Sequence, residues 1–414
     1  MADLQDELRT TAEVGELDPP AAWPDTEPSA PATLLGVVTG LDAGSGAPDR
    51  APVAEGPDAG SGAPDRAPVA EGPDPLADGP DPLARARTFL AGTPVADGYS
   101  GLPWALRHLP WFDLELGESA VDTDLPRLRE GHVGALFWSL HLPRGIAGDR
   151  AVGATLEQLD LVKTVTDAHP EGLRLARGAG EVADARNCGR VAVVLGPAGA
   201  AALGDSLGIL RALHALGLRV LTLTGASWAG ETGLTRFGEE VLREMNRLGV
   251  LADLSGASDA TIVRALAASK APALFTRSAA RALRPHPSNL SDAVLAELGV
   301  AKGLCMVPLT AEQTGPSVRD VADHLDHVRA LAGADCVGLS GTYDSGTAHP
   351  QDLADASCYP HLIAELITRG WSASDLALLT WGNVQRVLRG ADFTARAAQH
   401  RRPPSSARIA DLDG

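Results

Sequence analysis

The chain has 414 residues, of which 44% are hydrophobic and 21% charged, and its formal net charge is −18. This length and hydrophobic content are sufficient for one large domain or two ordinary ones. The negative charge argues against a nucleic-acid-binding surface, and the lack of an apolar run of eighteen residues argues against a transmembrane helix.

Most of the negative charge lies in the first 84 residues. Residues 1–84 contain 17 Asp and Glu against Arg9, Arg50 and Arg66, a net charge of −14, which leaves −4 for the remaining 330 residues. The segment 42–57 is repeated without change at 58–73. Repeats rich in Pro, Gly and Ala bury too little apolar surface to offset the entropy lost on ordering. We therefore predict a disordered arm over 1–84.

The two ends of the chain carry no recognisable targeting signal. Residues 1–10 are acidic, no apolar leader segment follows a basic start, and residues 401–414 are polar. We expect a cytoplasmic protein that does not bind membranes, with one domain over 85–392 and a polar C-terminal tail over 393–414.

Eight short apolar segments follow the arm, most of them separated by a stretch with a helical pattern. They are 94–98, 133–139, 190–196, 218–224, 249–254, 272–276, 303–309 and 336–341. A near-continuous apolar run is typical of a parallel strand covered on both faces. Eight such strands alternating with helices predict an α/β fold, a (β/α)₈ TIM barrel.

The helical patterns are clearest around the fourth segment, 218–224. Residues 206–216 and 237–248 carry apolar side chains at helical spacing and stop at Gly217 and Gly249. Glycine is favoured just after a helix, so both ends are well marked. A doubly wound sheet is the alternative fold, but no strand–G-x-G-x-x-G–helix unit supports dinucleotide binding.

The residues just after the strands decide what chemistry a barrel supports, because its active site lies at the carboxyl ends of the strands. In this chain they are Tyr99, Gly101, Ser139, His141, Ala198, Ala201, Gly225, Gly256, Arg277, Pro308, Thr342 and Asp344. A zinc or two-metal site needs several His and carboxylate side chains converging on one point. This set is poor in metal ligands.

Five segments carry a family resemblance. They are DGYSGLPWALR (97–107), LREGHVGALFWSLHLP (128–143), DSLGILRALHALGLRVLTLT (205–224), FGEEVLREMNRLGVLADLS (237–255) and VADHLDHVRALAGADCVGLSG (321–341). From about residue 93 to residue 388 the chain resembles the membrane dipeptidase (renal dipeptidase, peptidase M19) family. The resemblance implies a barrel of the metallo-dependent hydrolase type, whose working members cleave dipeptides at a two-zinc centre.

The residues at the family's functional positions differ from those of working members. By the resemblance, the metal-ligand positions are Tyr99, Gly101, Ala198, Gly225 and Gly256. The His of an S-H-S segment falls on Arg277, the catalytic Asp falls on Thr342, and no Arg precedes Asn289 to hold a substrate carboxylate. We therefore predict no zinc pair, no cofactor and no catalytic residue.

Four polar residues remain at the predicted mouth of the barrel: Tyr99, His141, Arg277 and Asp344. One interpretation is that they bind a small anion or a peptide terminus, because an arginine suits a carboxylate in bidentate geometry. The alternative is that Arg277 pairs with Asp344 and fills the volume that metal ions would occupy.

Two further motifs favour structural roles. Residues 204–208 spell G-x-S-x-G but lie well beyond their strand, so we predict that Asp205 or Ser206 caps a helix. His324 and His327 stand three residues apart on a predicted helix, where a solvated helix face is favoured over half a metal site.

Three functional hypotheses follow. The first is an inactive, dipeptidase-like pseudoenzyme that forms a homodimer or pairs with an active dipeptidase-like subunit. The second is a small-molecule- or peptide-binding protein that uses the barrel mouth. The third keeps an enzyme, either a residual dipeptidase that works through non-family ligands or a catalyst of metal-free chemistry that uses Tyr99, Arg277 and Asp344.

Overall fold

The computed structural model describes residues 81–109, 111–117, 120–143 and 145–414, all of which belong to the compact unit 70–414. The predicted arm over 1–84 lies outside the described residues except for its last four positions. Those four positions correct the prediction, because helix α1 (Pro82–Gly92) begins there. Asp81 accepts a hydrogen bond from the Leu83 N–H, Pro82 occupies the first turn, and Phe89 and Leu90 are buried. A capped start and an apolar anchor explain why order begins before residue 85.

Each of the eight predicted strands is present, with ends that differ by a few residues. They are β1 (Val95–Ser100), β2 (Val133–Trp138), β4 (Val191–Leu195) with its continuation β5 (Ala198–Gly199), β6 (Val220–Thr222), β9 (Leu251–Asp253), β10 (Leu274–Phe275), β11 (Leu304–Pro308) and β12 (Val337–Ser340). The strand β3 (Leu173–Leu175), which pairs with the first half of β4, was not predicted because three residues are too few to show a pattern.

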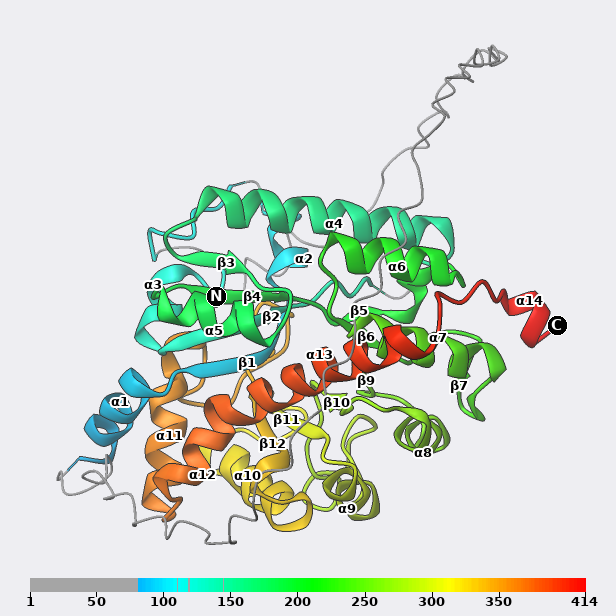
Figure 1. Ribbon diagram of the computed structural model, residues 1–414. Coiled ribbons are helices and arrows are strands. Elements are labelled where there is room, and N and C mark those ends of the chain that lie inside the picture. Colours follow the sequence, from blue (N-terminus) through cyan, green and yellow to red (C-terminus); the bar gives the residue numbers. More distant parts are fainter. Residues whose placement is uncertain (1–80, 110, 118–119, 144) are drawn as a thin grey trace, which may run out of the picture. The chain divides into compact units, whose positions relative to one another are not determined.

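The strands form one parallel sheet that closes on itself (Figure 1). From β1 the neighbours run through β12, β11, β10, β9 and β6 on one side, and through β2 and β4 on the other. A parallel bridge between Leu195 and Leu218 joins the chain at the end of β4 to the start of β6 and completes the ring. The predicted barrel is confirmed.

Helices follow most of the strands and surround the barrel (Figure 1). They are α2 (Leu102–Leu106), α3 (Leu125–Glu130), α4 (Asp149–Ala168), α5 (Ala179–Asn187), α6 (Leu207–Leu216), α7 (Arg236–Leu248), α8 (Asp259–Ala268), α9 (Asp292–Val300), α10 (Val318–Ala332), α11 (Tyr359–Thr368), α12 (Ala373–Ala377), α13 (Asn383–Arg401) and α14 (Ile409–Leu412). The strands β7 (Ala229–Gly230) and β8 (Gly233–Leu234) form a small hairpin between β6 and α7. In the part of the chain that is described, no helix is both long and apolar enough to cross a bilayer.

The two helices predicted around β6 show why the sequence patterns were reliable there. Helix α6 starts at a Ser206 side chain that accepts a hydrogen bond from the Ile209 N–H, and it ends at Gly217. Helix α7 starts at a Thr235 side chain bonded to the Gly238 N–H and ends at Gly249 in the left-handed region. Hydroxyl caps and terminal glycines satisfy backbone groups that the helix itself leaves unpaired.

Helix α13 covers the amino ends of the last strands and closes that end of the barrel. Its Val384, Val387 and Leu388 share a buried cluster with Leu304 and Met306 of β11. The guanidinium of Arg386 donates hydrogen bonds to three carbonyl groups, those of Lys302, Gly303 and Asp335. The predicted domain end at 392 therefore falls inside a helix that belongs to the barrel.

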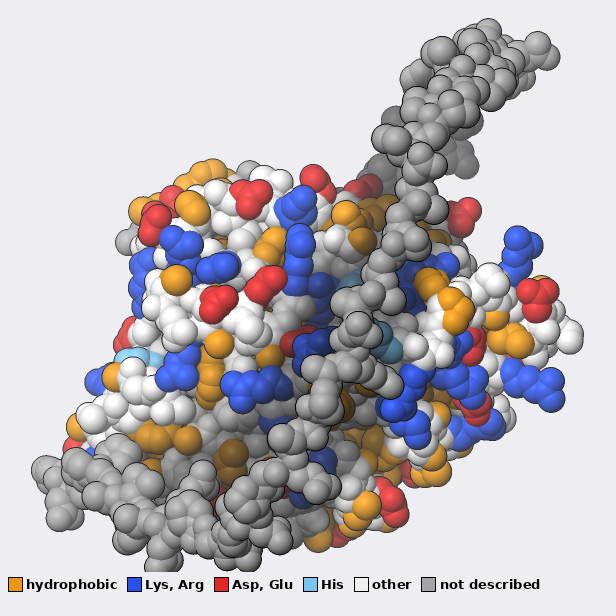
Figure 2. All heavy atoms as spheres, in the orientation of Figure 1, with side chains coloured by type: hydrophobic (Ala, Val, Ile, Leu, Met, Phe, Trp, Pro, Cys, Tyr) orange, Lys and Arg blue, Asp and Glu red, His pale blue; other side chains and the backbone are white. Residues whose placement is uncertain are grey.

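The predicted polar tail over 393–414 is joined to the same domain. Arg402 forms an ion pair with Glu240 of α7, and Arg211 of α6 donates a hydrogen bond to the Ser405 carbonyl. Asp413 accepts hydrogen bonds from the Thr235 hydroxyl and the Phe237 N–H. On the face crossed by α13, Figure 2 shows Lys and Arg side chains lying among Asp and Glu. Ion pairs and hydrogen bonds to residues distant in the sequence hold this end of the chain, together with partly buried Ala407, Ile409 and Leu412, and so short a set of apolar residues shows no periodicity in the sequence.

Candidate functional site

The carboxyl ends of the strands meet at one rim of the sheet, which we call the barrel mouth. It is formed by residues 99–101, 139–141, 198–201, 224–226, 254–256, 276–277, 308–310 and 341–344. The rim lies opposite the end covered by α13. Every predicted site residue lies in this rim.

Three of the four polar residues predicted at the mouth do come together. Tyr99 is buried at the end of β1, and Cζ of Arg277, which follows β10, lies 4.3 Å from the centre of its ring. The imidazole of His141, which follows β2, has its ring centroid 6.0 Å from that of Tyr99. A guanidinium above an aromatic face is stabilised by the electron-rich ring. We call this group the Arg277–Tyr99–His141 cluster.

The histidine of this cluster is held in place and kept neutral. Oγ of Ser139 lies 3.0 Å from Nδ1 of His141 and accepts a hydrogen bond from the His141 backbone N–H. Burial, and then the positive charge of Arg277, lower the pKa of His141 well below its ordinary value. Near neutral pH the cluster therefore carries one positive charge, that of the arginine.

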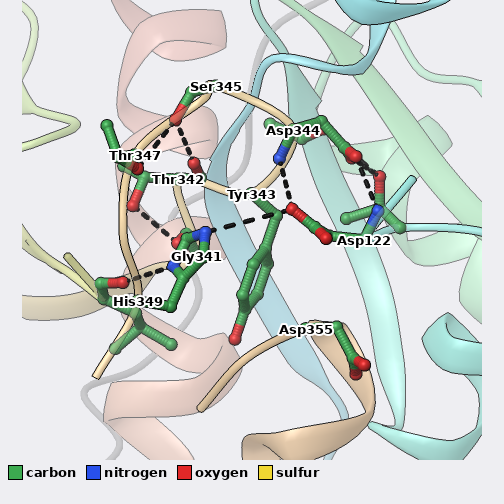
Figure 3. A network of polar contacts seen from close by, with 12 residues as sticks. Asp122, Gly341, Thr342, Tyr343, Asp344, Ser345, Thr347, His349 and Asp355 are labelled. Atoms are coloured by element: carbon green, nitrogen blue, oxygen red, sulfur yellow. Dashed lines mark hydrogen bonds and ion pairs between the residues drawn. The ribbon is translucent and has the colours of Figure 1, made fainter. Parts of the chain in front are cut away.

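Asp344, the fourth predicted residue, points away from the cluster. Its carboxylate accepts hydrogen bonds from the Asp122 N–H, 2.6 Å away, and from the Thr123 hydroxyl, while its own N–H donates to the Asp122 carboxylate (Figure 3). Burial raises the pKa of Asp344 to about 6. The predicted Arg277–Asp344 ion pair is wrong, because Asp344 is used to attach the loop after β12 to the segment before α3.

Thr342, at the position of the family's catalytic Asp, is also turned back into the protein. Its hydroxyl donates a hydrogen bond to the Gly341 carbonyl, 2.6 Å away, and its N–H donates to the Tyr99 carbonyl. The residue is buried and has a positive φ of 54°. A hydroxyl used in this way is not positioned to act as a general acid or base.

Sequence reasoning missed Asp97, which lies directly beneath the cluster on β1. The carboxyl group is fully buried, and one of its oxygens accepts hydrogen bonds from the N–H groups of Tyr99 and Gly341. Burial raises the pKa of Asp97 to about 7. Because residues two apart on a strand face the same side, the DGY sequence already indicated that Asp97 shares the inward face of Tyr99.

A second buried acid, Asp253, is by contrast fully engaged in hydrogen bonds. It accepts from the Thr222 hydroxyl at the end of β6, from the Ser255 N–H and hydroxyl, and from the Thr276 N–H after β10. These contacts connect the ends of three neighbouring strands. Asp253 therefore supports the shape of the mouth and is not available to a ligand.

The side chains at the mouth do not fit the two-zinc centre that the family resemblance implies. Gly101, Ala198, Gly225 and Gly256 offer no side-chain donor atom, and the Tyr99 ring is covered by the Arg277 guanidinium. Zinc sites in proteins are built from thiolate, imidazole and carboxylate ligands. Across residues 81–414, leaving aside the four undescribed positions, no group of three or more His, Cys, Asp and Glu side chains is arranged to hold a metal ion.

The backbone at these positions has a conformation suited to the residues present. Gly225 and Gly256 have φ angles of +77° and +72°, in the left-handed region that residues with a Cβ rarely adopt. A Cβ at Gly101 would collide with the backbone carbonyl of Asp344. Restoring a ligand at any of these three positions would therefore require a change of backbone as well as of side chain.

The two remaining sequence motifs have structural roles. Ser206 of G-x-S-x-G caps α6, as predicted. The solvated helix face predicted for His324 is wrong, because this residue is buried and its Nδ1 accepts a hydrogen bond from the Ala280 N–H. Burial lowers the pKa of His324 to about 4. His327 lies nearer the surface and pairs with Asp292 of α9.

Comparison with known protein sequences places these observations in context. The family described as "Membrane dipeptidase (Peptidase family M19)" matches residues 83–402. The chain is 38% identical over 330 residues to a protein of Mus musculus named Dipeptidase 3, a match that covers 74% of this chain and 66% of that protein. It is 34% identical over 343 residues to Dipeptidase verJ of Clonostachys rogersoniana, with 76% and 88% covered. The chain thus spans about two-thirds of the length of the mouse relative.

Solved structures agree on the fold. A metallo peptidase from Rhodobacter sphaeroides, crystallised with a phosphinate mimic of the dipeptide L-Ala-D-Ala, superposes with a TM-score of 0.66 at 25% identity. The superposition covers 72% of this chain and 99% of that one. A probable dipeptidase from Pseudomonas aeruginosa has a TM-score of 0.67 at 19% identity, over 76% and 99% of the two chains.

Proposed function

The chain belongs to the membrane dipeptidase family, and from this premise we propose that it is a pseudoenzyme, a member that keeps the dipeptidase fold without hydrolysing dipeptides. The observation that carries the proposal is the state of the metal-ligand positions. Four of the five, Gly101, Ala198, Gly225 and Gly256, have no donor side chain. The left-handed glycine backbone at two of them and the close contact at a third support the same conclusion.

The proposed loss of activity has a simple chemical basis. Hydrolysis in a metallopeptidase depends on a metal ion that lowers the pKa of bound water and polarises the scissile carbonyl. It also depends on a general base close to that water. Thr342, with its hydroxyl bonded to a backbone carbonyl, and Asp344, bonded to Asp122 and Thr123, do not provide that base.

Metal content and turnover, measured on the same sample, test this proposal. We expect purified full-length protein, incubated with excess zinc and then desalted, to retain much less than one equivalent. We also expect it to leave L,L- and L,D-dipeptides intact. The Rhodobacter sphaeroides metallo peptidase, carried through the same steps, is the positive control. Stoichiometric zinc together with turnover that a chelator abolishes would contradict the proposal and favour the residual-dipeptidase hypothesis.

A second candidate function is association with an active dipeptidase-like subunit or with a second copy of this chain. The observation that favours it is the exposure of two large apolar side chains on the segment after α2, Trp111 at 67% and Leu116 at 60%. Exposed aromatic and aliphatic side chains are typical of the central part of protein interfaces.

Light scattering over a hundredfold range of concentration, with and without a metal-loaded family member, tests this association. A monomer under all conditions would exclude it. If a complex forms, the double variant Trp111→Ser, Leu116→Ser should weaken it, and the matched surface variant Val300→Ser on α9 should not.

A further inference from the structure

Arg277 has no counter-ion among the residues that the structure describes, and the proposed function does not explain why this cation lies at the mouth. Its Nε is buried and has no hydrogen-bond partner. Among the residues whose positions are described, no carboxylate forms an ion pair with its guanidinium, which lies over the ring of Tyr99. Removing a charged group from water costs free energy unless the group is paired. A bound anion would offset this cost for Arg277.

The acids nearest to the strand ends do not provide that anion. Asp253 accepts four hydrogen bonds from neighbouring strand ends, and Asp344 is bonded to Asp122 and Thr123. Asp97 lies one layer lower on β1, where the N–H groups of Tyr99 and Gly341 hold one of its oxygens. The positive charge of the cluster is therefore not neutralised by these side chains.

The surroundings of the arginine favour a small ligand with a single negative charge. One guanidinium and one neutral imidazole make the cluster singly positive, whereas a phosphate dianion is usually held by several cations. The planar fork of an arginine matches the two oxygens of a carboxylate. The two strand ends next along the sheet from β10 carry little side-chain bulk: a Cβ built at Gly256, after β9, would meet only Ser288 Oγ at 3.9 Å, and one built at Gly225, after β6, would meet no heavy atom within 4 Å.

We infer that the barrel mouth binds a small monocarboxylate, such as the free carboxyl terminus of an amino acid derivative or a short peptide, with Arg277 pairing to the carboxylate. Tyr99 holds the guanidinium plane in place from below. His141, fixed by Ser139 through Nδ1, presents Nε2 as a second polar contact. The inference deepens the proposed function, since it gives the inactive barrel a ligand.

Two probes of equal size test the role of the carboxylate. N-acetyl-L-alanine carries one carboxylate, and N-acetyl-L-alaninamide has an amide in its place. Calorimetric titration and thermal denaturation of chelator-treated full-length protein, in acetate- and chloride-free buffer, should detect the acid and not the amide. Equal binding of both, binding of neither, or an equal effect of chloride would overturn the inference.

Variants of Arg277 locate the site. Arg277→Gln should weaken binding of the acid on the order of ten- to a hundredfold, the value of a hydrogen-bonded charge. Arg277→Lys keeps the charge but loses the planar fork, so this variant should retain part of the affinity for N-acetyl-L-alanine. Arg319→Gln, which removes an exposed positive charge from α10, is the matched control and should bind like the wild type. Wild-type affinity in Arg277→Gln would contradict the assignment.

The outcome of this test is separate from that of the proposed function. Zinc content and turnover are measured on the wild type without the probes, so an active enzyme would be detected whether or not Arg277 binds carboxylates. Conversely, a protein that neither hydrolyses dipeptides nor binds N-acetyl-L-alanine would leave the pseudoenzyme proposal intact and would refute only the inferred carboxylate binding.

Discussion

Charged groups in the helices around the barrel are paired with groups of opposite charge, whereas the arginine at the barrel mouth is not. On α7, the buried carboxylate of Glu244 accepts hydrogen bonds from Arg211 and Arg247. Arg369, just after the end of α11, likewise forms ion pairs with Asp323, Asp326 and Glu365. At the mouth, the guanidinium of Arg277 lies over a tyrosine ring, and no carboxylate of the described part of the chain forms an ion pair with it.

The pKa values of the carboxyl groups differ between the two regions in the same way. Burial alone would raise the pKa of Glu244, but hydrogen bonds from Arg247 and Arg211 bring it below its ordinary value. A hydrogen bond from Lys302 lowers the pKa of Asp335. At the mouth, burial raises the pKa of Asp97 to about 7 and that of Asp344 to about 6. Groups that are buried at a cost in free energy tend to occur where a protein binds or reacts.

The largest effect expected from this comparison is in the helical shell. Glu244→Gln leaves Arg247 and Arg211 without their shared carboxylate, and breaking a buried pair in this way costs about 4 kcal/mol. Urea denaturation measures this loss. Glu239→Gln, on the same helix but partly exposed, is the control and should cost less than about 1 kcal/mol. An equal loss of unfolding free energy in the two variants would mean that burial does not determine how much these ion pairs contribute to stability.

The next largest effect concerns Asp97 and depends on pH. With a raised pKa, the folded protein keeps this carboxyl protonated up to about pH 7, whereas the unfolded chain ionises it above 3.8. The stability it contributes is therefore complete below about pH 4 and is lost as the pH rises through 7. Asp97→Asn should match the wild type at pH 4 and be more stable on the order of 3 kcal/mol at pH 8.

Urea denaturation of both proteins from pH 4 to pH 8 measures the Asp97 effect. A difference that stays constant with pH would show that ionisation of Asp97 is not responsible. Asp149→Asn, at the exposed start of α4, controls for the loss of a surface charge and should follow the wild type throughout.

A smaller effect is expected from the glycines at the mouth. Gly225→Ala and Gly256→Ala force a Cβ into left-handed backbone, at about 1–2 kcal/mol each. Gly153→Ala, within α4 and with no atom near the added Cβ, should instead stabilise the protein by roughly 0.5–1 kcal/mol. Thermal denaturation should therefore give shifts of opposite sign. A gain in stability at residue 225 or 256 would contradict the backbone argument.

The smallest effect is expected for Arg277 itself in the absence of ligand. Removing an unpaired, partly buried charge relieves a desolvation cost, so Arg277→Gln should change the unfolding free energy by less than about 1 kcal/mol, in the stabilising direction. Arg319→Gln is again the control. A loss of several kcal/mol on replacing Arg277 would mean that the arginine is a structural part of the barrel, and the contrast with the shell would disappear.

The fold could be predicted because the signals that specify it are local. Eight apolar runs marked the strands, and residues such as Ser206, Gly217 and Gly249 marked helix ends. Order at residues 81–84 was not predicted although Asp81 and Pro82 mark a helix start locally, because the two residues follow the repeats of the acidic arm. The attachment of the chain after α13 was not predicted, because it depends on pairs distant in the sequence such as Arg402 with Glu240.

The site could be predicted only in part, because contacts between strand ends are not local. Position along the chain placed Tyr99, His141 and Arg277 at the mouth, and the structure brings them together. Asp344 occupies the same rim but is turned away from the cluster, toward Asp122 and Thr123, by hydrogen bonds that span 222 and 221 positions in the sequence. No spacing rule could have separated this residue from the other three.

The position of α13 has a consequence for how the protein is made. Residues 383–401 leave the ribosome after every strand of the barrel, yet their side chains cover Leu304 and Met306 at its base. The apolar base of the barrel can therefore be covered only after the last strand, β12, has been synthesised.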